Sequence, residues 1–334
     1  MDRRVSSEVI SHLSGQSQGG RSRSYVRWRD DGRERVLHCW GQAEEMNRRP
    51  WLASYVACLF FALMAICVRK LQALPTAEVM FFRCVLPVVL YIPMVLRSRS
   101  SLGLAWRHRG ALLSRGLCGT LSLYCYLVAI RLIPLADLAV TTNTSPLWTA
   151  LAAWWTLGEK PGYRLLWAFP ISFLGVALVA GSHVGGEPWG YLAGLASAAL
   201  AGTAYALLRK LRDLPPEVTA MAFLGLAGLC AFPFMLHAYQ APGPKQVAFI
   251  LGMGLSGAAG QWFMTLGYRY NTAATAASLG LATVALTAGL AFWLLNEPLG
   301  GGQMLGMILI VLGTLGASRQ AAPAGTETKA GNFS

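Results

Sequence analysis

The sequence predicts an all-α integral membrane protein with ten transmembrane helices, arranged as two inverted five-helix repeats. Three observations lead to this fold class: a strongly apolar composition, a series of apolar runs about 20 residues long, and an internal duplication. Residues 51–71 reappear, weakly but in order, at 191–211, an offset of 140, and further on the offset becomes 138 and pairs Glu159 with Glu297. Duplication of an apolar unit is typical of membrane transporters.

The composition excludes most soluble functions. Hydrophobic residues make up 54% of the chain and charged residues only 13%, which is typical of membrane proteins. Ten spans of ~20 residues would use ~200 of the roughly 270 positions between Pro50 and Ser318. The loops are then short, and no separate catalytic or nucleotide-binding domain fits between the spans.

The spans follow from apolar runs between charged or Gly/Pro-containing segments. The first half contains five runs, near 51–69, 77–96, 110–130, 136–157 and 164–181. The second half contains five more, near 189–208, 218–237, 246–267, 273–295 and 303–317. Because each half has an odd number of spans, the second half enters the membrane upside down relative to the first.

Lys and Arg residues indicate the orientation of these spans. With the amino terminus inside, the inner side holds fourteen Lys and Arg residues and the outer side four, namely Arg69, Lys70, Arg131 and Lys245. Positive residues concentrate on the cytoplasmic side of membrane proteins. We therefore expect a multi-pass protein of the cell inner membrane with both termini in the cytoplasm.

The domain organisation follows from the same pattern. Residues 1–50 form an Arg-rich segment without apolar periodicity, which predicts a disordered cytoplasmic tail, and Met46 is an alternative start just before the first span. The two repeats are expected at 51–181 and 188–318, followed by a disordered cytoplasmic tail at 319–334. The formal charge of +13 reflects membrane orientation, so we expect no nucleic-acid partner.

We expect no cofactor, no metal and no catalytic residues. Six of the seven Cys lie inside apolar runs without the CxxC or His-rich spacing of a metal site. An intramembrane aspartyl protease needs two apposed Asp, whereas only Asp137 lies near a span. The five His fall in tails, in loops or at helix ends, so no base is available for a serine enzyme.

Each half ends in a shared pattern of a small-residue helix, a pair of aromatic residues, and Leu-x-Glu before a Gly-containing helix. It includes Asp137-Leu138-Ala139, Ser145-Pro146-Leu147-Trp148, Leu157-Gly158-Glu159, Ala276-Ala277 and Leu295-Asn296-Glu297. With Phe81-Phe82-Arg83 in the second span, residues 51 to about 318 resemble the EamA-type branch of the drug/metabolite transporter superfamily. The resemblance implies ten spans in two inverted halves that move small polar metabolites, often amino acids or related compounds.

A polar segment before Pro146 marks the first candidate binding element. Proline removes a backbone hydrogen bond inside the fourth span, and Asn143, Thr144 and Ser145 supply polar groups beside it. These groups either face a substrate cavity or satisfy carbonyls of their own helix. The equivalent of Pro146 is Val284, so we expect the two halves to bend differently and the site to be asymmetric.

Polar stripes on other spans give further candidates. Gln261 and Thr265 share a face of the eighth span, and Arg115, Cys118, Gly119, Ser122 and Tyr126 form a stripe on the third. Such stripes line a cavity or bridge helices. Trp148 and Tyr205 offer aromatic faces to a cation or planar group, or belong to the core.

Charged residues near span ends carry two interpretations each. Arg83 lies about six residues into its span, where it either binds an anionic substrate or pairs and snorkels toward the membrane surface. Glu159 and Glu297 lie beside turns, where a carboxylate accepts hydrogen bonds from amides that begin the next helix. We favour this capping role over proton coupling, because no carboxylate occupies the centre of any span.

The sequence thus predicts a secondary transporter that moves a small polar metabolite, an amino acid or a derivative, across the inner membrane by alternating access, with export favoured. The alternatives are an uptake permease for a metabolite or vitamin and a non-transporting membrane assembly protein. The expected partners are this metabolite and membrane lipids, and the chain is expected to be a monomer or homodimer. The predicted substrate-binding residues are Asn143, Thr144, Ser145, Trp148, Tyr126, Tyr205, Gln261, Thr265 and Arg83.

Overall fold

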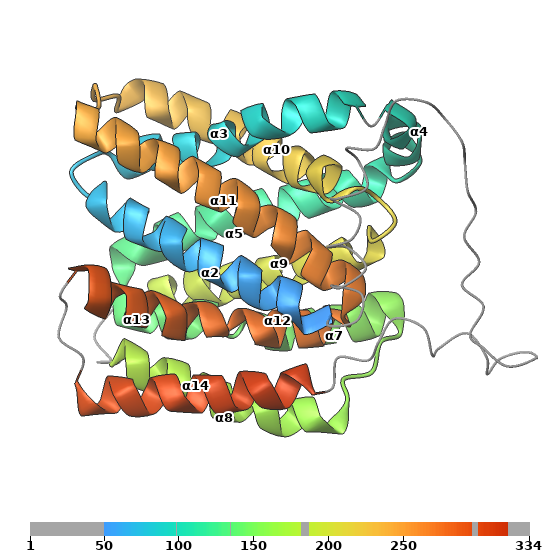
Figure 1. The fold of residues 1–334 in the computed structure, drawn as a ribbon, viewed down its shortest axis with the longest axis vertical. Helices are drawn as coiled ribbons and strands as arrows, with labels where there is room; N and C mark the ends of the chain where they lie inside the picture. The colour runs from blue at the N-terminus through green and yellow to red at the C-terminus, as the bar shows by residue number, and fades with distance from the viewer. Residues whose placement is uncertain (1–49, 98, 134, 182–186, 296–299, 320–334) are drawn as a thin grey trace, which may run out of the picture. The chain divides into compact units, whose positions relative to one another are not determined.

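The computed structural model describes residues 50–97, 99–133, 135–181, 187–295 and 300–319, and every regular element in these ranges is a helix. The predicted tails, Met46 and Glu297 lie outside the described residues. The helices of the first half are α2 (Pro50–Lys70), α3 (Thr76–Arg97), α4 (Arg99–Arg107), α5 (Arg109–Leu132), α6 (Leu135–Thr142), α7 (Ser145–Leu157) and α8 (Tyr163–Ala180). Those of the second half are α9 (Pro188–Lys210), α10 (Pro216–His237), α11 (Pro244–Tyr270), α12 (Ala273–Gly280), α13 (Ala282–Leu295) and α14 (Gly301–Ser318) (Figure 1).

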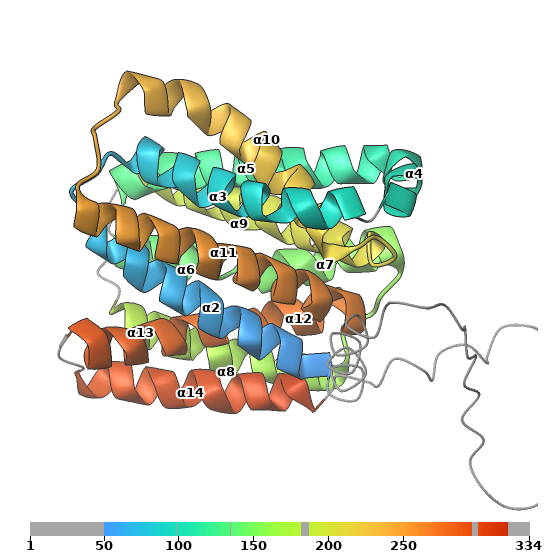
Figure 2. The same cartoon turned by 45° about the horizontal axis from the view of Figure 1, so that its top comes forward.

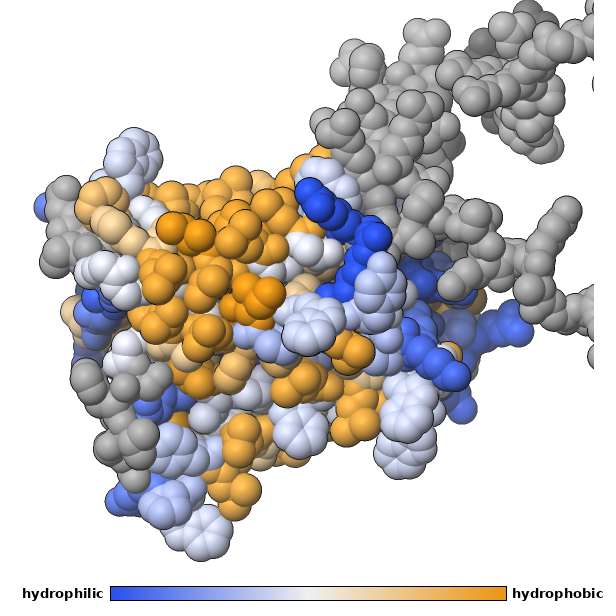
Figure 3. Space-filling view, turned by 90° about the horizontal axis from the view of Figure 1, so that it is seen from below, coloured by the Kyte–Doolittle hydropathy of each residue, from blue (hydrophilic) through white to orange (hydrophobic). Residues whose placement is uncertain are grey.

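Nine helical stretches of the described chain are long and apolar enough to cross a membrane. Their outer surfaces carry large exposed apolar side chains, which lipid can cover, and Figure 3 shows an apolar middle with hydrophilic residues at the two ends of that face. Trp155, Trp167 and Trp293 are largely exposed, as expected of aromatic anchors at the membrane surface. The protein is therefore a multi-pass membrane protein.

The fourth expected span, 136–157, is not among these nine stretches. It is divided into α6, of 8 residues, and α7, of 13 residues, with a turn at 143 and 144. Thr142 Oγ1 and Asn143 Nδ2 donate to the carbonyls of Leu138 and Ala139, both at 2.7 Å. Pro146 lies in the first turn of α7, where its missing N–H is harmless. Because neither α6 nor α7 is long enough to cross a membrane alone, this span, and with it the count of ten, stays a prediction.

The second half is interrupted at the equivalent position. Leu281, which is 138 residues after Asn143, lies between α12 and α13. Its N–H donates to the Ser278 carbonyl at 3.2 Å, and its own carbonyl accepts from Val284 N–H at 3.0 Å. Proline is therefore not required for the interruption. The two halves share the break and differ in its chemistry, which is polar at Asn143 and apolar at Leu281.

The helix order of the first half recurs in the second. Adding 138 to Leu135–Thr142 gives the bounds of α12, and adding 138 to Tyr163–Ala180 gives those of α14. The most extensively packed pairs are α8 with α14, α2 with α11, α5 with α9, and α3 with α10. Figures 1 and 2 both show α2 beside α11 and α8 beside α14. Each pair therefore joins one helix of each half.

Glycine permits the closest of these contacts. A Cβ at Gly175 of α8 would lie 2.5 Å from the Gly306 carbonyl oxygen of α14, and a Cβ at Gly202 of α9 would lie 2.6 Å from the Trp148 Cβ of α7. Side chains at these positions would separate the helices.

The α2 N-terminus and the α14 C-terminus lie at the same end of the bundle (Figure 1). We call this end the terminal end.

Candidate functional site

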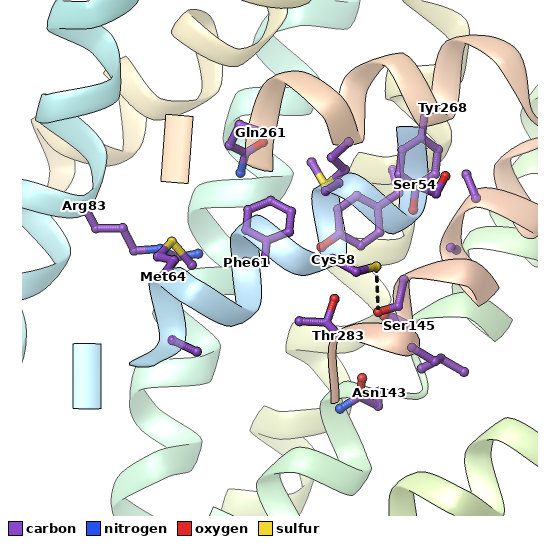
Figure 4. Close-up of a pocket in the computed structure, with 18 residues that line it drawn as sticks. Ser54, Cys58, Phe61, Met64, Arg83, Asn143, Ser145, Gln261, Tyr268 and Thr283 are labelled. Carbon is purple, nitrogen blue, oxygen red and sulfur yellow. Dashed lines mark hydrogen bonds between the residues drawn. The ribbon is translucent and has the colours of Figure 1, made fainter. Parts of the chain in front are cut away.

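A cavity of about 370 Å³ lies among helices of both halves. This volume lies within the range of small-molecule sites, about 300–1,000 Å³. Most of its polar lining side chains are labelled in Figure 4. It is lined by Ser54, Ala57, Cys58, Phe61, Met64 and Ala65 of α2; Arg83 of α3; Asn143 and Ser145 at the α6/α7 break; Tyr205 of α9; Gln261, Met264 and Tyr268 of α11; and Ala276, Ala277, Gly280, Leu281 and Thr283 around the α12/α13 break.

Both helix breaks contribute to the cavity. Asn143 lies in the first break, and because its Nδ2 donates to the Ala139 carbonyl, its Oδ1 stays available as an acceptor. Gly280 and Thr283 flank the second break. Interrupted helices are tolerated at membrane depth where they line a cavity, and in transporters they form the substrate site.

One face of α2 forms a wall of the cavity that the sequence did not indicate. Ser54, Cys58, Phe61 and Ala65 follow helical spacing along this wall. Cys58 Sγ donates to the Leu279 carbonyl at 3.5 Å and lies 3.8 Å from that of Gly280, the dashed contact in Figure 4. The only signal in the sequence was a stripe of small residues, which ordinary helix packing also explains.

An amide and two tyrosines form a further part of the lining. Gln261 is 8% exposed, and its side-chain amide makes no hydrogen bond with another described residue. The Tyr205 and Tyr268 rings stack with centroids 5.4 Å apart. The amide is therefore free to bind a ligand, and the aromatic pair gives the cavity a flat surface.

Arg83 supplies the charge. It is half-buried, and its Nη1 lies 3.7 Å from Met80 Sδ. In the described part of the chain, no carboxylate lies within ion-pair distance of Arg83. Glu78, the acid nearest in sequence, instead accepts a hydrogen bond from Gln240 N–H at 3.1 Å.

Of the nine predicted substrate-binding residues, the structure brings Arg83, Asn143, Ser145, Tyr205 and Gln261 together around the cavity. The other four lie outside its lining. Thr144 donates to the Thr141 carbonyl at 2.6 Å, and Thr265 donates to that of Gln261 at 2.8 Å. Trp148 packs its Cβ against Gly202, and Tyr126 packs against Ala129, Ile133 and Leu138. A role in binding stays a prediction for all nine.

The polar stripe on α5 bridges helices. Arg115 is 3% exposed, and its guanidinium lies 4.3 Å from the centre of the Phe223 ring of α10. Ser122 donates to the Ser197 carbonyl of α9 at 2.8 Å, and Ser197 donates back to the Ser122 carbonyl at 2.9 Å. Of the two roles expected for this stripe, lining a cavity and bridging helices, these contacts correspond to the second.

Three carboxylates connect the halves at the two ends of the bundle. At the terminal end, Glu159 pairs with Arg209 and also accepts from Ala273 N–H, at 2.9 Å each. Glu159 therefore caps a helix as expected, but that helix is α12 and not the next one in the chain. At the opposite end, Glu78 accepts from Gln240, and Asp137 accepts from the Tyr191 hydroxyl at 2.5 Å.

Within the ranges that the structure describes, no three His, Cys, Asp or Glu side chains cluster closely enough to hold a metal ion. The chemistry available in the cavity is hydrogen bonding, one positive charge and aromatic surface. That combination can bind a small polar molecule reversibly.

In this protein, apolar helices surround a cavity with polar groups at the points where two of them are interrupted. This arrangement is typical of membrane transport proteins. Comparison with known families narrows this class. The model of the EamA-like transporter family matches residues 50–181 and again residues 188–319. The chain therefore belongs to this family, within the drug/metabolite transporter superfamily, and the predicted resemblance is confirmed.

The curated relatives are transport proteins as well. The pseudopaline exporter CntI of Pseudomonas aeruginosa is 29% identical over 281 residues, covering 80% of this chain and 95% of the relative. Solute carrier family 35 member G1 of Homo sapiens is 27% identical over 230 residues, covering 63% and 62%. A riboflavin transporter of Rhizobium johnstonii is 25% identical over 211 residues, covering 60% and 67%.

The fold occurs among solved structures. One crystal structure superposes with a TM-score of 0.71 at 21% identity and covers 81% of this chain and 97% of its own. At this identity the likeness establishes the fold alone.

Proposed function

We propose that this protein is a secondary transporter that exports a small polar metabolite, an amino acid or an amino-acid derivative, across the inner membrane. The observation that carries the proposal is the polar cavity between the halves, in which the Gln261 amide, Asn143 Oδ1 and the Arg83 guanidinium lack strong partners among the described residues. Such groups are unfavourable inside a membrane protein unless water or a ligand forms hydrogen bonds with them. The likeness to an exporter, CntI, supports export.

The proposal includes ten spans in two inverted halves. It is supported by the symmetry of the helix pairs. If each helix is replaced by its counterpart in the other half, the pair α2–α11 becomes the pair α9–α5. The pairs α3–α10 and α8–α14 are unchanged by the same replacement. A two-fold axis in the membrane plane would produce this exchange. The excess of Lys and Arg on one side supports cytoplasmic termini.

Alternating access would open the two ends of the bundle in turn. The ion pair between Glu159 and Arg209 joins the halves at the terminal end. The hydrogen bond between Tyr191 and Asp137 joins them at the opposite end. Each contact joins one half to the other, so relative rocking of the halves must break it. In the proposed orientation the terminal end faces the cytoplasm.

The remaining features of the proposal follow the sequence. The repeats occupy 51–181 and 188–318 between cytoplasmic tails, and the chain functions in lipid as a monomer or homodimer without cofactor or nucleic acid. In this proposal the chain is a transporter, as its relatives are, and not an enzyme. The likeness to a riboflavin transporter favours one alternative, a permease that takes up a metabolite or vitamin.

Metabolite profiles test the proposal. Cells that overexpress the chain should accumulate a small polar metabolite in the medium, and cells that lack it should retain that metabolite. Asn143→Leu and Gln261→Leu should abolish the difference while inserting normally in the membrane. Depletion of the metabolite from the medium would favour uptake, and profiles unaffected by the chain would contradict transport.

A further inference from the structure

The charge of the cavity is positive and uncompensated. Among the described residues that line the cavity, Arg83 alone has a formal charge at neutral pH, and none is Asp or Glu. Its Nη1 lies 3.7 Å from Met80 Sδ, which is a weak acceptor. Figure 4 shows the Arg83 side chain extending from α3 toward the part of the cavity near Met64.

An unpaired guanidinium at this depth needs a partner. Arg83 is the eighth residue of α3, about 10 Å along the helix from its first residue. Charged groups are expensive within a bilayer unless they are paired or hydrated. The planar fork of a guanidinium matches the two oxygens of a carboxylate or phosphate.

We propose that the substrate carries an oxyanion, a carboxylate or a phosphate, which binds the Arg83 guanidinium in the cavity. This inference rests on the proposed transport function and specifies the chemistry of its substrate. Arg83 touches the substrate, and the Gln261 amide and Asn143 Oδ1 bind its other polar groups. A small cation without an anionic group is disfavoured by the charge of Arg83.

A second positive charge lies behind the cavity wall. Arg115 is buried, its Nε has no hydrogen-bond partner among the described residues, and its charge lies near Tyr205 and Tyr268. Both tyrosines line the cavity. A positive charge near these tyrosines also favours an anion in the cavity, although Arg115 itself does not line it.

Metabolites exported by cells that express the full chain test the inference. The variants are Arg83→Gln, which removes the charge, Arg83→Lys, which keeps it without the fork, and Arg97→Gln, a control at the exposed end of α3. Mass spectrometry of cells and medium identifies every metabolite whose export depends on the wild-type chain. Membrane fractions and thermal midpoints establish that each variant inserts and folds.

We expect the exported metabolites to contain a carboxylate or phosphate, and their identities distinguish these two sources. Because Arg83→Gln loses a charge-assisted hydrogen bond to the substrate, this variant should export roughly 10- to 100-fold less than the wild type. Arg83→Lys should retain part of the export, and Arg97→Gln should match the wild type.

Export of metabolites without an oxyanion, or unchanged export by Arg83→Gln, would overturn the inference. The transport function would survive that result, because Asn143→Leu and Gln261→Leu test it separately. If no metabolite depends on the wild-type chain, the proposed function fails instead. Should Arg83→Gln not reach the membrane, the chemistry of the metabolites exported by the wild type still decides the question.

Discussion

Glu159 and Arg209 form an ion pair between the two halves, with Oε1 2.9 Å from Nε. Glu159 follows α7 of the first half, and Arg209 lies in the last turn of α9 of the second. The second carboxylate oxygen accepts from Ala273 N–H at 2.9 Å, and Arg209 Nη1 donates to the Arg269 carbonyl at 2.5 Å. The ion pair thus joins the ends of α7, α9, α11 and α12.

Neutralising Glu159 should weaken this end of the bundle. Glu159→Gln keeps an acceptor for Ala273 N–H but removes the charge that pairs with the partly buried Arg209. We expect a loss of about 1–2 kcal/mol, since hydrogen bonds to charged groups contribute somewhat more than neutral ones. Thermal unfolding of the purified protein measures it as a shift of about 1–4 °C in Tm. Glu187→Gln, at an exposed position whose side chain caps no helix, should leave Tm unchanged, and equal Tm values for both variants would contradict the role of the pair.

Weakening the two ends should have opposite effects on access to the cavity. A reporter Gly280→Cys, placed in a variant with the native cysteines replaced by Ala, presents a thiol to the cavity because no heavy atom lies within 4 Å of its Cβ. Glu159→Gln should increase its labelling from the terminal end several-fold, since a contact that closes this end is weakened. Tyr191→Phe, which removes the donor to Asp137, should increase labelling from the opposite end.

Membrane-impermeant maleimides applied to right-side-out and inverted vesicles measure these two rates. The parent reporter supplies the baseline, and the exposed substitution Glu187→Gln serves as the matched control. Increased labelling from the same side in both variants would show that the two contacts do not close opposite ends.

The sequence predicted what depends on composition and spacing. Apolar runs located the helices, and the polar segment before Pro146 located the first break, because both signals are local. Arg83 and Gln261 were found because polar groups inside apolar runs are conspicuous. Their placement around one cavity required the tertiary structure.

Long-range packing explains what the sequence did not predict. Ser54 and Phe61 of α2 line the cavity because of how α2 packs against α11 and α13, and a single sequence does not contain that pairing. The capping contact of Glu159 reaches Ala273, 114 residues away, whereas the turn beside Glu159 indicated the next helix. The break at Leu281 had no proline to mark it.

Enlarging Gly175 should separate α8 from α14. A Cβ there would lie 2.5 Å from the Gly306 carbonyl oxygen and 2.8 Å from the Ile310 backbone nitrogen. Because backbone cannot move aside, Gly175→Ala should destabilise the protein by about 1–3 kcal/mol. Size-exclusion chromatography after heating would show less intact protein. Gly302→Ala, where a Cβ meets no atom within 4 Å, should behave like the wild type, and equal stability of the two variants would argue against close α8–α14 packing.

Filling the cavity at Gly280 should separate transport from stability. Gly280 lines the cavity at the end of α12, and a Cβ there meets no heavy atom within 4 Å. Gly280→Leu would therefore start its side chain in open space of the cavity, and leucine favours a helix more than glycine does by roughly 0.5–1 kcal/mol. We expect export to fall at least about tenfold while Tm stays constant or rises. The matched control is Gly225→Leu on α10, which also has no atom within 4 Å but borders a groove away from this cavity. If Gly280→Leu exports as well as Gly225→Leu does, the substrate does not occupy the part of the cavity beside Gly280.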